Sequence, residues 1–186
     1  MSLQGYAVRH AVSLGCEAEA THVIWSEFEA AAPEVARLGA ERLLRTGLAI
    51  VATIRRDGTP RIDPVEPFFS HGHLLLGMMR SQKAFDLLRD PRCLLHNPIS
   101  DPNGSEGEFK LRGRAVDVQG ANLWEGYRQA YADRWKRRPP EGFPFRVFSL
   151  DIDSAALIRW DIEKGEMIIG LWSLAHGVTE TRRKYP

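Results

Sequence analysis

Short strand-length segments joined by tight-turn signals constrain the fold of this chain more than any other feature. Residues 48–54 are apolar and rich in β-branched side chains, and the Asp57-Gly58 pair that follows is typical of a two-residue hairpin turn. A second strand is expected over residues 60–69, and His71-Gly72-His73 predicts a turn before a third strand over residues 74–79. Hairpin turns join antiparallel neighbours, so this part of the chain predicts an antiparallel sheet.

The remaining sequence adds further strands and three helices. The first helix is expected to begin near Pro33 and to end at Gly47, and the other two to span residues 83–89 and 121–137. Gly113 predicts a bulge in a half-exposed strand. The further strands are expected over residues 93–96, 108–118, 145–152, 155–160 and 166–172.

This order of elements predicts the fold class. Seven or eight strands in hairpin order normally close into a barrel or a sandwich, because closure removes unpaired sheet edges. No strand–helix–strand alternation runs through the sequence, which argues against a doubly wound parallel sheet. The expected class is therefore mainly β with flanking helices (α+β), built as a small antiparallel β-barrel.

Composition narrows the possible partners. With 186 residues the chain has the length of about one domain, and 25 Lys and Arg against 24 Asp and Glu leave a net charge of +1. A charge this close to zero gives no field for collecting nucleic acid or anionic membranes. No apolar run reaches the roughly 18 residues that a membrane span needs. We therefore expect neither a nucleic-acid partner nor a membrane partner.

Cysteine usage and the first residues indicate the compartment and the domain limits. Cys16 and Cys93 lie far apart without a Cys-x-x-Cys motif, which argues against a disulfide framework or a zinc site and favours a reducing cytoplasm. Residues 1–22 show neither a sustained period nor the basic-then-apolar order of a secretory signal. We expect them to form a loosely ordered leader, and residues 23–186 to form a single domain.

One stretch carries a candidate anion site. Ser81 stands where the N-cap of the second helix belongs, and Lys83 lies in the first turn with Arg80 just before it. A cation in the first turn opposes the helix dipole, and a bound phosphate would account for it because helix N-termini bind anions. Arg61, on the neighbouring strand, is placed to reach the same group. The alternative is that Ser81 only caps the helix and Lys83 is solvated.

Two prolines in the preceding strand suggest what else the site contacts. Pro64 and Pro67 cannot donate to a sheet ladder, so the strand is broken or lies at an edge there and leaves neighbouring peptide groups free. Free N–H and C=O groups can recognise the edge of a planar heterocycle. Met78 and Met79 lie between this strand and the helix start, and they complete the candidate ligand site.

Several motifs in this region together resemble a known family. Their order and spacing are similar to those of the pyridoxamine 5'-phosphate oxidase-like flavin-binding split-barrel family over residues 35–185. The resemblance implies an antiparallel split β-barrel of the FMN-binding type and a homodimer with the cofactor at the subunit interface. The motifs are Thr53, Asp57-Gly58-x-Pro60-Arg61, Ser81-x-Lys83 and Asp90-Pro91-Arg92.

The resemblance also implies roles for single residues. Arg61 and Lys83 match contacts to the FMN phosphate with Ser81 beside them, and residues 62–65 match the strand that runs along the isoalloxazine ring. Trp172 and Arg182 resemble a pair that approaches FMN from the partner subunit; the alternative is a core tryptophan and a solvated arginine. The resulting cofactor-binding set is Arg61, Ile62, Pro64, Val65, Met78, Met79, Arg80, Ser81, Lys83, Trp172 and Arg182.

Departures from the family's pattern argue against the named oxidase activity. Glu66 stands where the true oxidases have a lysine, Gln82 where an arginine is common, and Glu108 where a glutamine is usual. The change at residue 66 reverses a charge next to the expected phosphate site. Anionic pyridoxamine phosphate would be repelled, so this chain is not expected to be the true pyridoxamine phosphate oxidase.

The function expected from these features is that of an FMN-dependent oxidoreductase acting on a small-molecule substrate or on oxygen. The flavin performs the chemistry, so no catalytic side chain is named. One alternative is an F420-dependent reductase, with Arg80, Arg112 and Arg114 lining a basic groove. Another is a non-catalytic flavin- or haem-binding protein, with His96 or His176 as the axial ligand. No metal site is expected.

Overall fold

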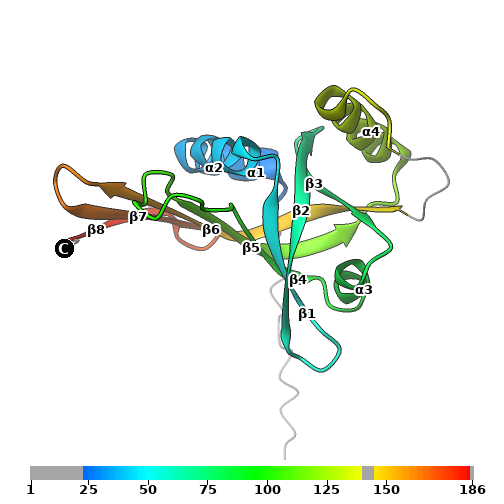
Figure 1. Ribbon diagram of the computed structural model, residues 1–186, viewed down its shortest axis with the longest axis horizontal. Coiled ribbons are helices and arrows are strands. Elements are labelled where there is room, and N and C mark those ends of the chain that lie inside the picture. Colours follow the sequence, from blue (N-terminus) through cyan, green and yellow to red (C-terminus); the bar gives the residue numbers. More distant parts are fainter. Residues whose placement is uncertain (1–22, 140–144, 185–186) are drawn as a thin grey trace, which may run out of the picture.

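The antiparallel strands that the hairpin signals predict are present. The computed structural model describes residues 23–139 and 145–184, and the expected leader, residues 1–22, lies outside this part of the chain (Figure 1). The described residues form eight strands and four helices. In chain order they are α1 (Trp25–Ala31), α2 (Pro33–Arg45), β1 (Ala49–Ile54), β2 (Pro60–Ser70), β3 (His73–Met79), α3 (Gln82–Arg89), β4 (Arg92–His96), β5 (Glu108–Asp117), α4 (Ala121–Trp135), β6 (Phe145–Asp161), β7 (Glu166–Ser173) and β8 (Gly177–Lys184).

The strands form one antiparallel sheet that closes on itself in part. Their order is β3-β2-β1-β4-β5-β6-β7-β8, and an additional pairing between β3 and β6 closes the first six strands of this order into a barrel. β7 and β8 continue the sheet beyond the barrel, and Figure 1 shows the β6–β7–β8 arm extending away from it. The predicted class, mainly β with flanking helices and an antiparallel barrel, is confirmed.

A single long strand, β6, belongs to both the barrel and the arm. Residues 145–149 pair with β3, residues 148–158 with β5, and residues 154–161 with β7. The predicted division of this segment into two strands is wrong, because a bulge absorbs the polar residues at its centre and the pairing continues. The bulge lies opposite Arg112 and Gly113, but its extra residue is Asp153 of β6, whereas the sequence predicts a bulge or bend in the strand that contains Gly113. A Cβ on Gly113 would lie 2.0 Å from the carbonyl oxygen of Asp151, so the bulge requires glycine.

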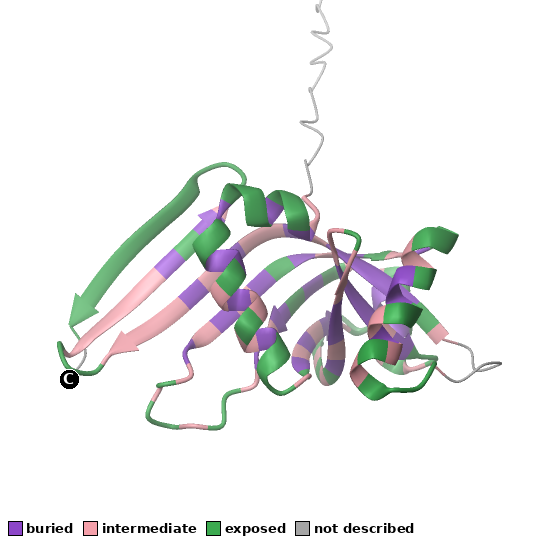
Figure 2. Cartoon of the chain, turned by 90° about the horizontal axis from the view of Figure 1, so that it is seen from above, coloured by how far each residue is buried: buried purple, intermediate pink, exposed green. Residues whose placement is uncertain are grey.

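The last strand, β8, is not expected from the sequence pattern. It pairs with β7 along its whole length, yet every one of its residues is exposed (Figure 2). An exposed strand shows no alternation of apolar and polar residues, and this alternation is the main sequence signal for a strand. Only the turn glycine Gly177 and the β-branched Val178 mark it.

Two apolar cores hold the helices against the sheet. The larger core lies between the sheet and helices α1 and α2, where the rings of Trp25 and Phe28 meet edge to face. The smaller core lies beneath α4, where Tyr127 and Tyr131 pack on Phe68 of β2. Tyr127 and Tyr131 of α4 therefore serve packing, while Trp135 at the end of the helix is exposed. α4 is the longest of the described helices at 15 residues, and no helix in the described ranges has the length and apolar character to cross a membrane.

Candidate cofactor site

The candidate site lies where β3 separates from β2. The β2–β3 ladder ends at the pair Glu66 and Gly77, and beyond it Met78 and Met79 pair with β6 instead. Residues 60–65 have no partner strand on this side within the described sheet, as the prolines predict. The gap holds a cleft of about 450 Å³, here called the β2–β3 cleft. It is lined by Leu48, Pro64, Val65, Glu66, Gly77, Met78, Met79, Ser81, Lys83, Tyr131, Arg137 and Phe145.

The first turn of α3 borders the β2–β3 cleft. Ala84 and Leu87 are buried and fix the helix against the barrel, while Ser81 takes the N-cap position with φ −134° and ψ 165°. The serine makes no capping hydrogen bond, and its hydroxyl oxygen is buried without a partner among the described residues. A buried polar atom without a partner is uncommon in a native protein and points to a missing ligand or water. The free N–H groups of the first turn add partial positive charge.

Lys83 places a cation in the same cleft. Its ammonium group donates a hydrogen bond to the carbonyl oxygen of Pro64, one of the peptide groups of β2 that the sheet leaves unpaired. Burial lowers the pKa of Lys83, and the nearby carboxylates of Asp63 and Glu66 oppose this shift without cancelling it. The cleft therefore combines two cations, Lys83 and Arg137, with one carboxylate, Glu66, and an apolar wall that includes Val65 and Met78.

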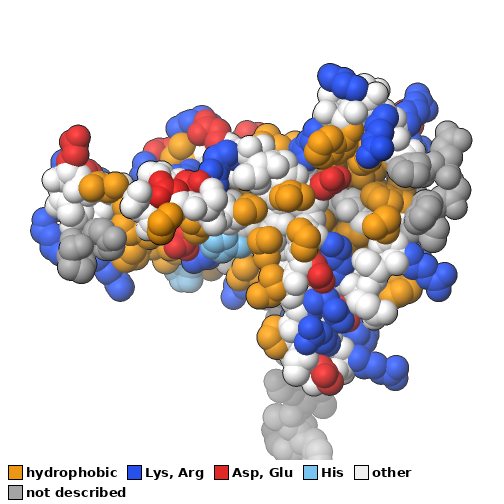
Figure 3. Space-filling model, viewed as in Figure 1, with side chains coloured by type: hydrophobic (Ala, Val, Ile, Leu, Met, Phe, Trp, Pro, Cys, Tyr) orange, Lys and Arg blue, Asp and Glu red, His pale blue; other side chains and the backbone are white. Residues whose placement is uncertain are grey.

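Arg61 faces a different cleft, on the other side of α3. This open cleft of about 820 Å³, here called the arginine cleft, lies between the β1–β2 hairpin and α3. It is lined by Arg55, Arg56, Asp57, Arg61, Gln82, Phe85, Asp86 and Arg89. Figure 3 shows Lys and Arg side chains gathered over this part of the molecule. Arg61 Nε donates to Asp86 Oδ2 at 2.7 Å.

The structure brings together most of the predicted cofactor-binding residues. Pro64, Val65, Met78, Met79, Ser81 and Lys83 line one cleft, and Arg61 reaches the neighbouring one across the first turn of α3. Ile62 and Met79 are 69% and 60% exposed, so two apolar side chains next to the site face solvent. Arg80 lies with its guanidinium 5.5 Å from the centre of the Phe85 ring.

Trp172 and Arg182 do not join this site within one subunit. Both belong to the β6–β7–β8 arm. Trp172 is only 3% exposed and its ring lies 4.7 Å from that of Phe28, which is the placement of a core tryptophan. Arg182 is exposed and pairs with Glu166 and Glu180. A contact of these residues with a cofactor in the partner subunit stays a prediction.

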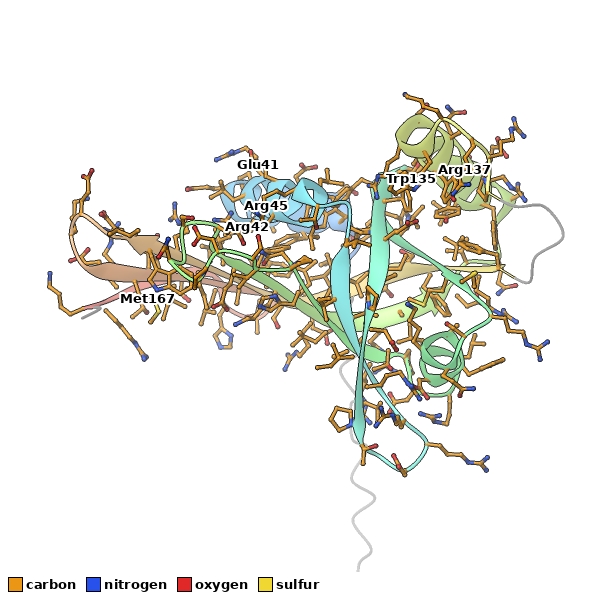
Figure 4. All side chains as sticks on the ribbon, viewed as in Figure 1. Glu41, Arg42, Arg45, Trp135, Arg137 and Met167 are labelled. Carbon is orange, nitrogen blue, oxygen red and sulfur yellow. The ribbon has the colours of Figure 1, made fainter. Side chains whose placement is uncertain are left out.

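The predicted cofactor-binding set lacks six residues that line the β2–β3 cleft, namely Leu48, Glu66, Gly77, Tyr131, Arg137 and Phe145. It also lacks one charged residue of α3, Asp86. Tyr131 of α4, Arg137 just beyond its end (Figure 4) and Phe145 of β6 line the cleft, but they lie far from Ser81 in the sequence. Only the closure of the barrel brings them there. The sequence does contain a signal for Asp86, because this carboxylate lies between Ala84 and Leu87 on the apolar face of α3.

A third cleft lies on the exposed face of the sheet. It has a volume of about 500 Å³, and His176 at the β7–β8 turn is among its lining residues. The Nδ1 atom of His176 contacts the hydroxyl of Ser173 at 3.2 Å. We call this cleft the sheet cleft. It is lined by Leu94, Lys110, Arg112, Ser154, Ala155, Ala156, Leu171, Trp172, Ser173, His176, Gly177 and Thr179. The described residues contain no cluster of three or more His, Cys, Asp or Glu side chains that would hold a metal ion.

Comparison with known sequences finds no relative. No protein-family model matches the chain, and no curated protein matches it. The fold, in contrast, matches solved structures.

Three similar structures illustrate that match. A pyridoxamine 5'-phosphate oxidase-related, FMN-binding protein from Nostoc punctiforme has a TM-score of 0.55 at 13% identity, over 82% of this chain and 96% of its own. PhzG from Burkholderia lata, in complex with tetrahydrophenazine-1-carboxylic acid, has a TM-score of 0.58 at 10% identity, over 86% of this chain and 93% of its own. HutZ, the heme storage protein from Vibrio cholerae, has a TM-score of 0.52 at 16% identity, over 66% of this chain and 89% of its own.

These similarities define the class of fold. The chain is a split-barrel protein. Its fold is that of the pyridoxamine 5'-phosphate oxidase-like proteins, as the resemblance in the sequence predicts. Proteins with this fold include both FMN-binding and heme-storing examples, so the cofactor has to be argued from the site itself.

Proposed function

We propose that this chain binds FMN and acts as a flavin-dependent oxidoreductase. The observation that carries the proposal is the buried hydroxyl of Ser81, which has no hydrogen-bond partner at the uncapped start of α3, with the ammonium group of Lys83 in the same cleft. A phosphate group would accept hydrogen bonds from the hydroxyl and from the free N–H groups of the first turn. The residues present therefore fit a phosphate-bearing cofactor.

The β2–β3 cleft suits the ring of the same cofactor. Met78 and Val65 are buried and give it an apolar wall, and the unpaired peptide groups of residues 62–65 supply hydrogen-bonding partners along one edge. Ligand sites of this kind combine a mostly apolar lining with a few polar groups that fix orientation. In this arrangement Lys83 would exchange its bond to the Pro64 carbonyl for the stronger, charge-assisted contact to phosphate. Arg61 would approach from the arginine cleft.

The protein's part in the reaction is to bind and orient. When bound, a flavin supplies the hydride and electron transfer, and no side chain needs to be a catalytic acid or base. Glu66 places a negative charge in the cleft, and together with the bound FMN phosphate it disfavours a second anion, such as the substrate pyridoxamine phosphate. We therefore propose a neutral or cationic small organic substrate, or oxygen, as the acceptor.

A homodimer with the cofactor at the subunit interface completes the proposal. Leu94, Leu171 and Val178 expose large apolar side chains on the sheet, a surface that a second copy of the chain would cover. Arg182 on the exposed strand β8 would then reach the partner's site.

Absorbance and flavin titration test the proposal. Purified protein should be yellow, and the mass of the released cofactor distinguishes FMN from F420. We expect Ser81→Ala and Lys83→Met each to weaken FMN binding about 10- to 100-fold, the usual effect of losing a hydrogen bond to a charged group. The matched control is Lys164→Met, since Lys164 is exposed in the β6–β7 turn and its only ion pair among the described residues is with Asp161. A colourless protein that takes up no FMN would overturn the proposal.

The sheet cleft supports a second candidate function, the binding of haem. His176 has its Nε2 atom free of any partner in the described structure, and Lys110 and Arg112 in the same cleft are suitable partners for haem propionates. Titration with hemin would then give a Soret band that His176→Ala removes. A Soret band that is unchanged in this variant would exclude His176 as the ligand.

A further inference from the structure

Asp86 is the one charged residue that α3 buries. Its side chain is 5% exposed and lies on the helix face that also buries Ala84 and Leu87. Removing a carboxylate from water is costly unless charged or hydrogen-bonding groups compensate for it. The burial of this carboxylate therefore has to be explained by the groups that bind to it.

Three side chains from three elements donate to this carboxylate. Thr53 of β1 donates to Oδ2 at 3.2 Å, Arg61 of β2 donates through Nε to the same oxygen at 2.7 Å, and Arg89 of α3 donates to Oδ1 at 3.3 Å. Burial raises the pKa of Asp86, but these hydrogen bonds outweigh it and the net shift is downward. Asp86 is thus ionised at neutral pH and holds the two strands and the helix together.

Arg61 and Arg89 differ in which guanidinium nitrogens remain without a hydrogen bond among the described residues. Arg89 uses both terminal nitrogens, one for Asp86 and the other for the carbonyl oxygen of Ile54. Arg61 is held through Nε alone, and its two terminal nitrogens have no partner among residues 23–139 and 145–184. The guanidinium group is planar and rigid, so a bond at Nε fixes the direction in which the free pair of N–H₂ groups points.

The free end of Arg61 belongs to a cleft with excess positive charge. Four arginines and two aspartates line the arginine cleft, which leaves a net charge of +2. One of the aspartates is Asp86 itself, and the other, Asp57, accepts two hydrogen bonds from Thr59 within the hairpin turn. Gln82, the first residue of α3, lines the same cleft. The terminal nitrogens of Arg61 thus share a cleft with the start of the helix.

We propose that Asp86 is a positioning residue for the cofactor phosphate. It holds Arg61 through Nε so that the two terminal N–H₂ groups are presented together to a phosphate at the first turn of α3. The inference rests on the proposed function, because it assumes that the phosphate belongs to FMN. Arg89 supports Asp86 and does not contact the ligand.

The test compares FMN with riboflavin, which carries the same ring system without the phosphate. Flavin fluorescence gives the Kd of both ligands for the full chain, for Arg61→Ala, for Asp86→Asn and for the double variant. We expect Arg61→Ala to weaken FMN binding about 10- to 100-fold and Asp86→Asn about 5- to 10-fold. Riboflavin affinity should stay within about twofold, and Asp86→Asn should have no further effect once Arg61 is alanine.

Two further variants separate positioning from folding. Asp90→Asn removes a carboxylate just after the same helix, and within the part of the chain that the structure describes this carboxylate pairs only with Arg92. The substitution should leave both affinities unchanged. Arg89→Met removes one partner of Asp86 but keeps the Arg61 pair, and FMN affinity should stay within about threefold of wild type. A larger loss of FMN affinity in Arg89→Met would overturn the role assigned to Arg61.

Four results would overturn the positioning role. Equal loss of FMN and riboflavin in Asp86→Asn would show that the carboxylate supports only the fold. Additive losses in the double variant would show that Asp86 does not act through Arg61. Unchanged FMN affinity in Asp86→Asn, with tight binding by the wild-type chain, would overturn the positioning role and leave the proposed function standing. Failure of the wild-type chain to bind either flavin would overturn both.

Discussion

The hydroxyl group of Tyr127 lies against the backbone of Gly77. A Cβ atom on Gly77 would be 2.2 Å from Tyr127 Oη, so α4 can approach β3 this closely only because residue 77 is a glycine. The contact matters for the site, because Gly77 also lines the β2–β3 cleft. The seating of α4 and the shape of the cleft therefore depend on the same residue.

Replacing Gly77 by alanine should destabilise the protein. The new methyl group overlaps the tyrosine ring, and forcing extra atoms into a packed core costs about 1–3 kcal/mol. Urea unfolding followed by tryptophan fluorescence measures the loss. Gly170→Ala is the matched control, since its Cβ would meet Leu157 only at ordinary contact distances of 3.6–3.9 Å. Equal effects of the two substitutions would contradict the overlap.

Tyr127→Phe should stabilise the protein. Burial raises the pKa of Tyr127, and its hydroxyl has no hydrogen-bond partner among the described residues, so the folded state carries an uncompensated polar group. Removing such a group should raise the free energy of unfolding by about 1 kcal/mol. The unfolding midpoint in urea checks this. A clear loss of stability would mean that the hydroxyl has a partner, for example an internal water.

Cys93 should be unreactive in the folded protein. Burial, assisted by the charge of Asp153, raises the pKa of its thiol to about 12, so almost no thiolate is present at pH 8. Because the thiolate is the reactive form, a disulfide reagent should modify Cys93 only when the chain unfolds. The measurement uses Cys16→Ser, which leaves Cys93 as the single cysteine. Fast labelling without urea would show that the thiol is accessible.

Glu106 should contribute stability that is lost in acid. Hydrogen bonds from the side chains of Arg45 and Ser100 lower its pKa from 4.5 to about 2. A carboxyl group whose pKa is lower when folded stabilises the protein above its unfolded pKa and loses this effect as the pH falls through the folded value. Glu106→Gln should therefore differ most from wild type above pH 5, and the two should converge near pH 2. Thermal unfolding across this range measures the difference.

Glu66→Gln should admit anionic ligands that the wild-type site disfavours. Glu66 lines the β2–β3 cleft with Lys83, and removing about 1 kcal/mol of repulsion would tighten the binding of pyridoxal 5'-phosphate about fivefold. Isothermal titration measures this affinity. Pyridoxal without the phosphate is the control ligand, and an equal gain for both ligands would contradict the electrostatic argument.

The sequence predicts the local features of the fold well, because they depend on residues that are close together. The turn at His71 and Gly72 is an example, since both residues have positive φ, 49° and 75°, as a two-residue hairpin requires. The start of α3 after Ser81 and the irregular strand pairing at Gly113 are others. Each is signalled by one or two residues with strong conformational preferences.

The rest of the site depends on long-range pairing, which local patterns do not report. Pairing of β3 with β6 brings Phe145 beside Met79, and the packing of α4 brings Tyr131 to the same cleft. The separation of Arg61 from Lys83 is equally hidden, because it follows from the position of α3 between the two clefts. Arg61 and Lys83 can therefore reach one phosphate only from opposite sides of the helix start, and sequence spacing does not indicate this.

The continuity of β6 also has a consequence for synthesis in the cell. The barrel closes when residues 145–149, at the start of β6, pair with β3, so the two edges of the nascent sheet cannot be joined before the ribosome has made this part of β6. At about 5–20 residues per second, the edges of β3 and β5 stay open for a few seconds after β5 has emerged. Open edges are templates for pairing with other chains. Nascent chains of this protein should therefore need chaperones most during the interval between the emergence of β5 and that of β6.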